Sequence, residues 1–350
     1  MTDRRNIAEP PAEVIRLHNH QAKLEGVIVI HSALLGLSLG GCRVWPYPTI
    51  DEAFADAVRL AEGMSYKNAM AALPFGGAKA VIRRPEGDYD KAALFEAFGE
   101  AVDRLGGRYI TAQDVGTCVS DMEHVAQRTG HVVGRPADGR LAGGDPSRWT
   151  ALGVVHAMQA ASRRVLSSEL EGRTVAVQGL GHVGSELCRR LVEAGARLIV
   201  ADIDRPRAEA LANELGAGIA DTADIALMHV DVFAPCALGG AITRKVANAM
   251  RARLICGAAN NQLAAPDIAH DLAARGITYV PDYVANAGGI VSAAAEYMRE
   301  DRSVVAGRVA GIGPRVSIIL EEAARSKLPP LVIADRIAEL IMRTGQAERL

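Results

Sequence analysis

The chain has 350 residues, more than a typical single domain holds, so two domains are expected. It carries 39 lysines and arginines against 41 aspartates and glutamates, with no basic stripe, which argues against a nucleic-acid partner. No signal peptide and no apolar run of membrane-spanning length is evident. The five cysteines are scattered, and no C-x-x-C, H-E-x-x-H or histidine cluster occurs. We therefore expect a cytoplasmic protein without a membrane partner, disulfide framework or metal site.

Helical and strand patterns alternate along the first part of the chain, which predicts α/β layering. The predicted helices are 12–23, 51–72 and 91–105, and the predicted strands are 26–31, 38–44, one containing Lys79, and 108–112. Residues 134–147 are rich in Gly, Pro and Asp and form the expected domain boundary.

The second part of the chain shows short apolar strands, which are typical of a doubly wound parallel sheet. The predicted strands are 173–178, 198–201, 231–234, 254–256 and 278–280, and the predicted helices are 149–164, 185–193, 290–300, 303–327 and 331–341.

A glycine-rich motif, G-x-G-x-x-G, directly follows the predicted strand 173–178. Its residues are Gly179, Leu180, Gly181, His182, Val183 and Gly184. A predicted helix follows, and an acid, Asp202, stands about 20 residues on, which completes the dinucleotide-binding fingerprint. The first glycine allows the tight turn, the second lets the backbone reach a pyrophosphate, and the third lets helix and strand pack closely. Backbone N–H groups at the helix N-terminus are expected to bind the phosphates.

Asp202 predicts the choice of dinucleotide. Its carboxylate can accept hydrogen bonds from the ribose hydroxyls and repels a 2′-phosphate, so NAD is favoured over NADP. Ile203 beside it is a further expected cofactor contact. Arg205 and Arg207 lie just beyond, so use of NADP stays open.

Lysine is rare in this chain, since only six of its cations are lysines. Two of them, Lys67 and Lys79, lie twelve residues apart, and Gly76-Gly77 precedes the second. Arginine keeps its proton near neutral pH, whereas a buried lysine can lose it and act as a base. The glycine pair suggests a backbone that comes close to a ligand. From the pair alone, two ordinary surface lysines remain an equally good interpretation.

Several motifs taken in order resemble the Glu/Leu/Phe/Val dehydrogenase family of amino acid dehydrogenases. The matching segments are 40–43, 63–67, 76–79, 111–117, 150–154, 179–184, 257–261 and 281–289, within about 25–300 of the chain. Two departures are Ser65, where the family often has threonine, and Ala78, where leucine-type members usually have glycine.

The resemblance implies a two-domain α/β fold with an active-site cleft between the domains. Residues 1–140 would form a substrate-binding, catalytic and oligomerisation domain, on which helices from about 326–350 pack back. Residues 141–325 would form a Rossmann NAD-binding domain. The family forms homo-oligomers, so a dimer or higher assembly is expected.

The resemblance also implies residue roles. Lys67 would anchor the substrate α-carboxylate, Lys79 would be the base that activates water, and Asp114 would handle protons at the amine nitrogen. An anchor must stay charged while a base must be neutral, and two nearby lysines push each other's pKa apart. Gly40 and Gly41 would bring backbone amides to the substrate carboxylate. The remaining contacts with nicotinamide, ribose or substrate amine would come from Thr150, Ala258, Asn260 and Asn286.

Substrate class follows from what the pocket lacks. Leu39 and Ala293 stand where glutamate-type members carry a lysine and a serine for the side-chain carboxylate. Burying a carboxylate against them would cost several kcal/mol. Ala112 and Ile290 would complete an apolar pocket. We expect reversible, NAD-dependent oxidative deamination of an apolar L-amino acid of the leucine or branched-chain type to the 2-oxo acid and ammonia.

Three alternatives stay open. Ala293 is small and could make room for phenylalanine or another aromatic side chain. A hydroxy-acid dehydrogenase would share the glycine motif but normally uses a His-Arg-carboxylate set. A non-catalytic NAD-binding regulatory protein would not need Lys79 and Asp114.

Overall fold

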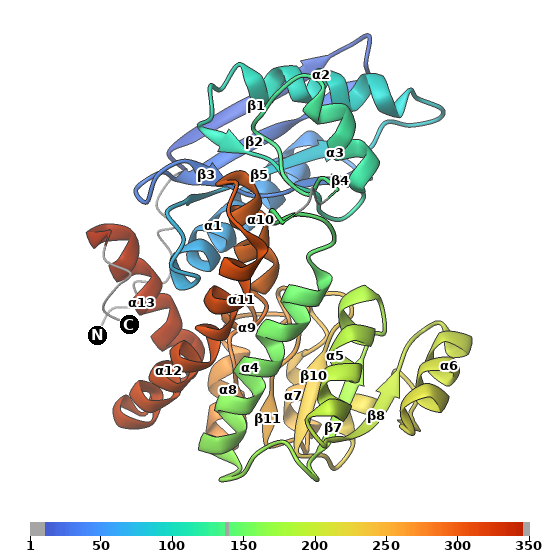
Figure 1. Ribbon diagram of the computed structural model, residues 1–350, viewed down its shortest axis with the longest axis vertical. Helices are drawn as coiled ribbons and strands as arrows, with labels where there is room; N and C mark the ends of the chain where they lie inside the picture. The colour runs from blue at the N-terminus through green and yellow to red at the C-terminus, as the bar shows by residue number, and fades with distance from the viewer. Residues whose placement is uncertain (1–10, 137–139, 346–350) are drawn as a thin grey trace. The chain divides into compact units, whose positions relative to one another are not determined.

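The computed structural model describes residues 11–136 and 140–345; the parts of the predicted segments 1–140 and 326–350 that fall on 1–10, 137–139 and 346–350 lie outside them. The described chain forms two compact units. The first runs to Gly144 and also contains Ala293–Glu300 and the chain from Glu339, and the second contains Asp145–Ser292 and Asp301–Ala338. Both units are α/β, as predicted (Figure 1).

The first unit is built on a mixed six-stranded sheet with the order β1-β2-β5-β3-β6, in which β4 also pairs with β5. The strands are β1 (Glu13–Asn19), β2 (Leu24–Ser32), β3 (Ser38–Leu39), β4 (Cys42–Trp45), β5 (Gly76–Arg83) and β6 (Tyr109–Ile110). The predicted strand 38–44 is interrupted at Gly40-Gly41, where the chain leaves β3 and enters β4.

The helix predicted near residues 12–23 is wrong, because this segment is strand β1. It pairs antiparallel with β2 from Glu13↔Ile30 to Asn19↔Leu24. Ile15 and Leu17 point inward while the residues between them are exposed, which is the two-residue period of a strand.

Helices cover both faces of the first sheet. They are α1 (Ile50–Met70), α2 (Lys91–Asp103) and α3 (Val119–Ala126), of which α3 was not predicted. Leu94, Phe95 and Phe98 of α2 pack on Ala80 and Ile82 of β5 in the main core of this unit. Helix α1 lies on the opposite face (Figure 1).

Helix α1 approaches the sheet closely because its buried side is made of small residues. Ala53, Ala57 and Ala61 follow one another at helical spacing and pack on Val81 of β5. A Cβ at Gly77 of β5 would lie 2.1 Å from the backbone nitrogen of Ser65, so only glycine fits there. Of the Gly76-Gly77 pair, expected to make room for a ligand, Gly77 makes room for α1 and Gly76 makes room for the backbone of Ser32.

The second unit contains a parallel six-stranded sheet with the order β12-β11-β10-β7-β8-β9. Its strands are β7 (Thr174–Gln178), β8 (Arg197–Ala201), β9 (Gly218–Ile219), β10 (Val232–Pro235), β11 (Leu254–Ile255) and β12 (Thr278–Tyr279). The chain runs outward from β7 in one direction and from β10 in the other, so the order reverses between these two strands. This is the doubly wound topology with its ligand-binding switch point, as predicted.

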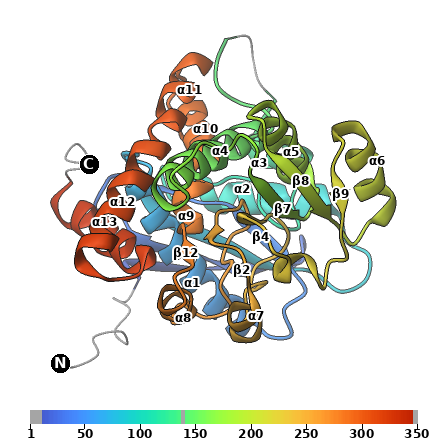
Figure 2. The same cartoon turned by 90° about the horizontal axis from the view of Figure 1, so that it is seen from below.

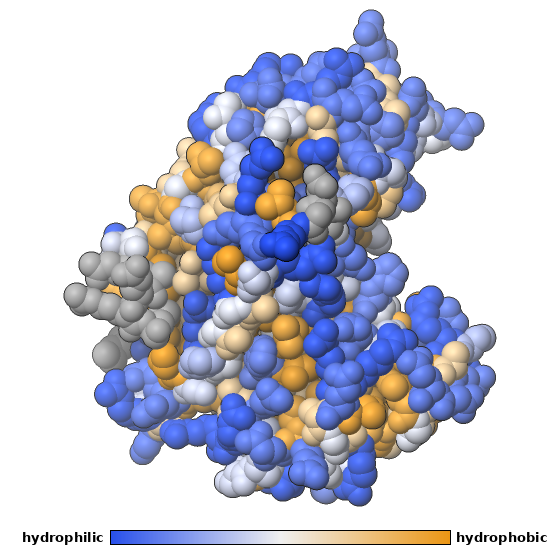
Figure 3. Space-filling view, viewed as in Figure 1, coloured by the Kyte–Doolittle hydropathy of each residue, from blue (hydrophilic) through white to orange (hydrophobic). Residues whose placement is uncertain are grey.

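Helices flank the second sheet on both faces. They are α4 (Ser147–Val165), α5 (His182–Glu193), α6 (Arg205–Leu215), α7 (Arg244–Ala249) and α8 (Ile268–Ala274). The later helices are α9 (Asp282–Ala285), α10 (Gly288–Tyr297), α11 (Arg302–Ala310), α12 (Ile312–Ser326) and α13 (Pro330–Thr344). Of these, α11 and α12 pack on α4, and the last residues of α10 and α13 belong to the first unit. Figure 2 shows α4 and α5 on one side of the strands and α7 and α8 on the other. Hydrophilic side chains predominate over α6 (Figure 3), where Arg205 and Glu209 form an ion pair.

The predicted helix 303–327 is two helices, α11 and α12, which meet at Gly311. Pro314 lacks a backbone N–H and is tolerated only in a first turn, so it fits the start of α12. Taken together as Arg302–Ser326, α11 and α12 are long and apolar enough to cross a membrane, and they form the one such stretch in the described chain. The expectation that the sequence holds no apolar run of membrane-spanning length is therefore wrong by length and composition. Val309, Ile312 and Val316 of this stretch are buried inside the protein, as in a core helix.

Candidate active site

Lys79 is buried on the side of the first sheet that faces α1. Alternate residues of a strand point to opposite faces, so Lys79 shares its face with Gly77 and Val81. Only 7% of its side chain is exposed. A buried lysine requires a partner, because isolated burial of a charge is costly.

Asp114, in the loop after β6, is that partner. Its Oδ2 lies 2.6 Å from Lys79 Nζ and accepts a second bond, at 3.3 Å, from Arg43 Nε of β4. Burial alone would raise the pKa of Asp114, but the cations of Lys79 and Arg43 outweigh it and hold that pKa at about 2. Asp114 is therefore a carboxylate at neutral pH. The loop is fixed by Thr117, whose Oγ1 accepts from the Asp114 N–H at 2.8 Å.

Arg43 is a site residue that the sequence did not single out. On its far side its Nη1 donates to Asp56 Oδ2 of α1 at 3.0 Å, and Tyr47 OH donates to the same oxygen at 2.5 Å. Nothing local marks Arg43, because arginine is this chain's usual cation and Asp114 is 71 residues away.

The two glycines before β4 differ in what they do. The Gly40 N–H donates to Ile110 O at 3.1 Å within the sheet, and a Cβ at Gly40 would lie 1.7 Å from Ala78 O. Gly40 is thus needed for strand packing. The Gly41 N–H has no hydrogen-bond partner within 11–136 and 140–345, so only Gly41 keeps an amide for a ligand.

Asn68, one residue after Lys67 on α1, joins the strand ends around these glycines. Its Nδ2 donates to Leu39 O at 3.2 Å and to Gly76 O at 2.6 Å. Lys67 itself is half-buried, one helical turn beyond Gly63. Sequence reasoning missed Asn68, since a buried asparagine inside a helix gives no local signal of its partners.

The four residues of the predicted side-chain pocket differ in accessibility. Leu39 has no exposed surface and is part of the sheet, paired with Gly77 and Ile110. The other three, Ala112, Ile290 and Ala293, are partly exposed.

The glycine motif of the second unit adopts the predicted geometry at the end of β7. Gly179 has φ +95°, a left-handed conformation that favours glycine, and a Cβ there would meet the backbone after β10 at 2.7 Å. A Cβ at Gly184 would lie 2.0 Å from Gly179 O. At Gly181, by contrast, no atom lies within 4 Å of such a Cβ, so this point opens to a ligand. Helix α5 begins at His182, earlier than the predicted Ser185.

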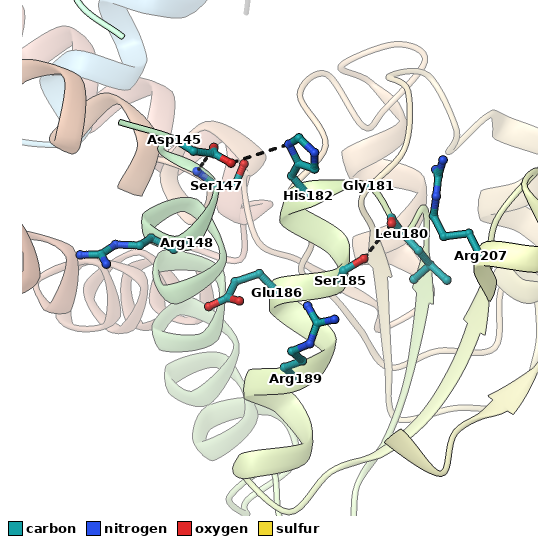
Figure 4. Close-up of a pocket in the computed structure, with 10 residues that line it drawn as sticks. All are labelled: Asp145, Ser147, Arg148, Leu180, Gly181, His182, Ser185, Glu186, Arg189 and Arg207. Carbon is teal, nitrogen blue, oxygen red and sulfur yellow. Dashed lines mark hydrogen bonds and ion pairs between the residues drawn. The ribbon is translucent and has the colours of Figure 1, made fainter. Parts of the chain in front are cut away.

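A pocket of about 790 Å³ opens at this helix N-terminus. Figure 4 shows His182 pointing toward Asp145, and their side chains lie 3.7 Å apart. The lining residues are Asp145, Ser147, Arg148, Leu180, Gly181, His182, Ser185, Glu186, Arg189 and Arg207. Three arginines and the N-terminal amides of α5 suit an anionic group such as a pyrophosphate.

Asp202 is built into the same turn. Its Oδ2 accepts from Leu180 N–H at 2.6 Å, and its Oδ1 accepts from Asp204 N–H at 2.8 Å. Arg207 Nη1 lies 3.7 Å from Oδ1. Ile203 is 94% exposed, an apolar side chain standing in solvent beside the acid.

Two asparagines, one after β11 and one after β12, are hydrogen-bonded to each other. Asn286 Nδ2 donates to Asn260 Oδ1 at 2.9 Å and to Ala258 O at 3.1 Å. Asn286 Oδ1 is buried and has no hydrogen-bond partner among the described residues, so it is an acceptor that awaits a donor. Thr150 lies against the following turn, since a Cβ at Gly289 would be 2.7 Å from its Oγ1.

The sequence matches two family descriptions that together span most of the chain. Residues 12–131 match the Glu/Leu/Phe/Val dehydrogenase dimerisation domain. Residues 144–205 and 200–309 match Glutamate/Leucine/Phenylalanine/Valine dehydrogenase. The chain belongs to the Glu/Leu/Phe/Val dehydrogenase family. It is an amino acid dehydrogenase, an oxidoreductase of a family that uses nicotinamide dinucleotides.

Individual relatives of this dehydrogenase cover nearly its whole length. It is 42% identical to leucine dehydrogenase of Geobacillus stearothermophilus over 96% of this chain and 92% of the relative. It is also 42% identical to valine dehydrogenase of Streptomyces albus, over 96% and 93%. The crystal structure of L-tryptophan dehydrogenase from Nostoc punctiforme superposes with a TM-score of 0.84 at 36% identity, covering 97% of both chains.

We expect the dehydrogenase to lose stability in acid partly through Asp114. The pKa of this group is lowered from 3.8 to about 2, so its stabilisation is complete above pH 3.8 and is lost as pH falls through 2. The contribution is about 2 kcal/mol. The gap in unfolding free energy between wild type and Asp114→Asn should therefore shrink as urea unfolding is repeated from pH 7 toward pH 2. The exposed Asp88→Asn serves as control, and a constant Asp114 gap would contradict the assignment.

Proposed function

We propose that the dehydrogenase deaminates a branched-chain L-amino acid, of the leucine or valine type, with NAD as oxidant, giving the 2-oxo acid and ammonia. The observation that carries this is the buried Lys79–Asp114 pair, whose Nζ and Oδ2 atoms lie 2.6 Å apart, and Lys67 of α1 is the second lysine of the proposal. The names of the relatives, leucine and valine dehydrogenase, support the substrate class.

Each charged residue takes one role. Lys67 stays protonated and binds the α-carboxylate, with the Gly41 N–H as a further donor. Lys79 in its neutral form takes a proton from the water that attacks the substrate imine. Asp114 receives and returns protons at the substrate nitrogen, and its low pKa keeps it ionised at neutral pH, so that it has an oxygen ready to accept one.

The second unit fits NAD. Gly181 leaves open space at the α5 N-terminus, and Asn286 Oδ1 offers an unused buried acceptor for a carboxamide N–H. Asp202 is assigned to the ribose by its place after β8, where a ribose hydroxyl would share its oxygens with the Leu180 and Asp204 amides. When bound, the nicotinamide accepts the hydride from the substrate Cα. Asp202 repels a 2′-phosphate, while Ile203 offers an apolar surface to the adenine.

The residues matched to the side-chain pocket are all apolar. Ala112, Ile290 and Ala293 are partly exposed, and Leu39 is fully buried. None of them can pair with a charge, which disfavours glutamate. The second candidate is an aromatic amino acid, favoured by the small Ala293 and by the likeness to a tryptophan dehydrogenase.

Assembly and location are part of the proposal. The match of residues 12–131 to a dimerisation domain supports a homo-oligomer. The five unpaired cysteines, Cys42, Cys118, Cys188, Cys236 and Cys256, fit the reducing cytoplasm.

Kinetic measurements can distinguish the proposed roles of Lys67 and Lys79. Lys79→Ala should lower kcat by about 100-fold or more, because it removes a general base. Lys67→Ala should chiefly raise KM for the amino acid, since the anchor acts on ground state and transition state alike. Both are measured by NADH absorbance, with the exposed Lys245→Ala as control. Equal effects of the two changes on kcat alone would refute this division.

Substrate preference is tested by an amino acid panel read as kcat/KM. Leucine, valine or isoleucine should lead, and glutamate should be at least about 100-fold poorer. Leu39→Lys with Ala293→Ser should admit some glutamate and reduce leucine turnover, whereas Ala293→Ser alone should not admit glutamate. If the wild-type enzyme turned over glutamate as fast as leucine, the assignment of an apolar side-chain pocket would be refuted. If phenylalanine or tryptophan were clearly preferred, the small Ala293 would be identified as the residue that makes room for an aromatic side chain.

Cofactor choice should depend on the charge of Asp202. Asp202→Asn keeps one acceptor oxygen but removes the repulsion, so the NADP-to-NAD ratio of kcat/KM should rise about tenfold. Asp221→Asn removes an exposed charge next to Arg205 and serves as control. Equal wild-type turnover with NADP and NAD would contradict the role of Asp202.

A further inference from the structure

Arg43 shares one carboxylate oxygen with the proposed base. It lies on β4 in register with Val81 of β5, and 19% of its side chain is exposed. Its Nε lies 3.3 Å from Asp114 Oδ2, the atom that also receives Lys79 Nζ at 2.6 Å. Asp114 thus stands between two cations, of which only the lysine can lose its proton near neutral pH.

Arg43 is itself held from the other side. Asp56 of α1 binds its Nη1 at 3.0 Å and is fixed in turn by Tyr47 OH and by Arg59 Nη2, each at 2.5 Å. Burial opposes ionisation of Asp56, but Tyr47, Arg59 and Arg43 together lower its pKa. The result is a row of alternating charge from the site to the surface. Side-chain exposure is 7% at Lys79, 16–19% at Asp114, Arg43 and Asp56, and 54% at Arg59.

We propose that Arg43 is a positioning residue that keeps Asp114 ionised and in place while Lys79 is neutral, and that Asp56 adjusts how strongly it does so. This rests on the proposed function, in which Lys79 is the base. When Lys79 has no proton, Asp114 loses one of its two cations. Without Arg43 the mostly buried carboxylate would itself gain affinity for the proton. With Arg43 it stays ionised until the substrate nitrogen gives up its proton, which Asp114 can then accept.

Other groups around Lys79 leave this balance to a few charges. Burial raises the pKa of the Cys42 thiol on β4 and of the Tyr109 phenol on β6, so both are neutral in the working range. Asp121 of α3 is paired with Lys91 at 2.8 Å. The ion pairs that start at Lys79 run through Asp114 of the loop after β6 and Arg43 of β4 to Asp56 of α1. His31 of β2 is a further titratable group on the side facing α1, where it is hydrogen-bonded to Ser65 at 2.9 Å.

Opposite shifts of the pH profile test the proposal. The readout is the acidic limb of the kcat/KM profile for deamination, the pH range in which activity rises as the proposed base of the site loses its proton. Arg43→Gln removes a neighbouring positive charge, so this limb should move to higher pH by about one unit and kcat at neutral pH should fall about tenfold or more. Asp56→Asn removes the negative charge that partly compensates Arg43, so the positive charge of Arg43 should favour the neutral form of the base more strongly. The acidic limb should therefore move to lower pH by about a few tenths of a pH unit. Arg43→Lys should restore the limb but not the full kcat, because it keeps the charge without the fork.

The outcomes separate this inference from the proposed function. A wild-type enzyme inactive on every amino acid refutes both. An active wild type whose limb stays in place in Arg43→Gln refutes the inference alone, since a purely structural role lowers activity without moving the limb. If Arg43→Gln does not fold, as judged by Tm, Asp56→Asn decides: a limb that stays or moves to higher pH overturns the proposal.

Discussion

The close contact of α1 with β5 is the constraint on which the first unit depends. It exists because one helix face carries Ala53, Ala57 and Ala61, and because Gly77 leaves room for the Ser65 backbone. Burial of Lys79 is a consequence, since that residue follows Gly77 on the same face of the strand. A larger residue at 77 would lift the helix and let water reach the lysine. Packing of small residues thus creates the low-dielectric setting in which charges influence one another strongly.

Within that setting the charges are ordered rather than merely paired. Asp114 carries the negative charge between Lys79 and Arg43, and its low pKa follows from them despite burial. In the second unit, backbone groups rather than charged side chains shape the candidate cofactor site. There Gly179 and Gly184 bring loop, helix and strand together, and Gly181 leaves the space for phosphates. One unit supplies groups that exchange protons, and the other supplies fixed dipoles that do not.

Much of this could be predicted from the sequence because the signals are local. Gly179 to Gly184 with Asp202 fall within one strand–helix–strand unit, and the lysines and Asp114 stand in motifs with a fixed order. Arg43 and Asp56 could not be found this way, because their partnership depends on β4 lying beside β5 under α1. Segment 12–23 was misassigned since its strand character comes from pairing with β2. Leu39 was assigned to the pocket by matching, whereas its complete burial depends on the sheet around it.

The hydrogen bond from Leu180 N–H to Asp202 joins the acid proposed to select the cofactor to the turn proposed to bind its phosphates. A replacement at 202 therefore changes recognition and also loosens the loop. A change of dinucleotide specificity by substitution of Asp202 would first destabilise the loop, because the acceptor of the Leu180 amide is lost before a contact with the new cofactor exists. If another residue were first introduced that accepts the Leu180 N–H, Asp202 could be replaced without loss of loop order, and a change of cofactor would become possible in evolution or in engineering.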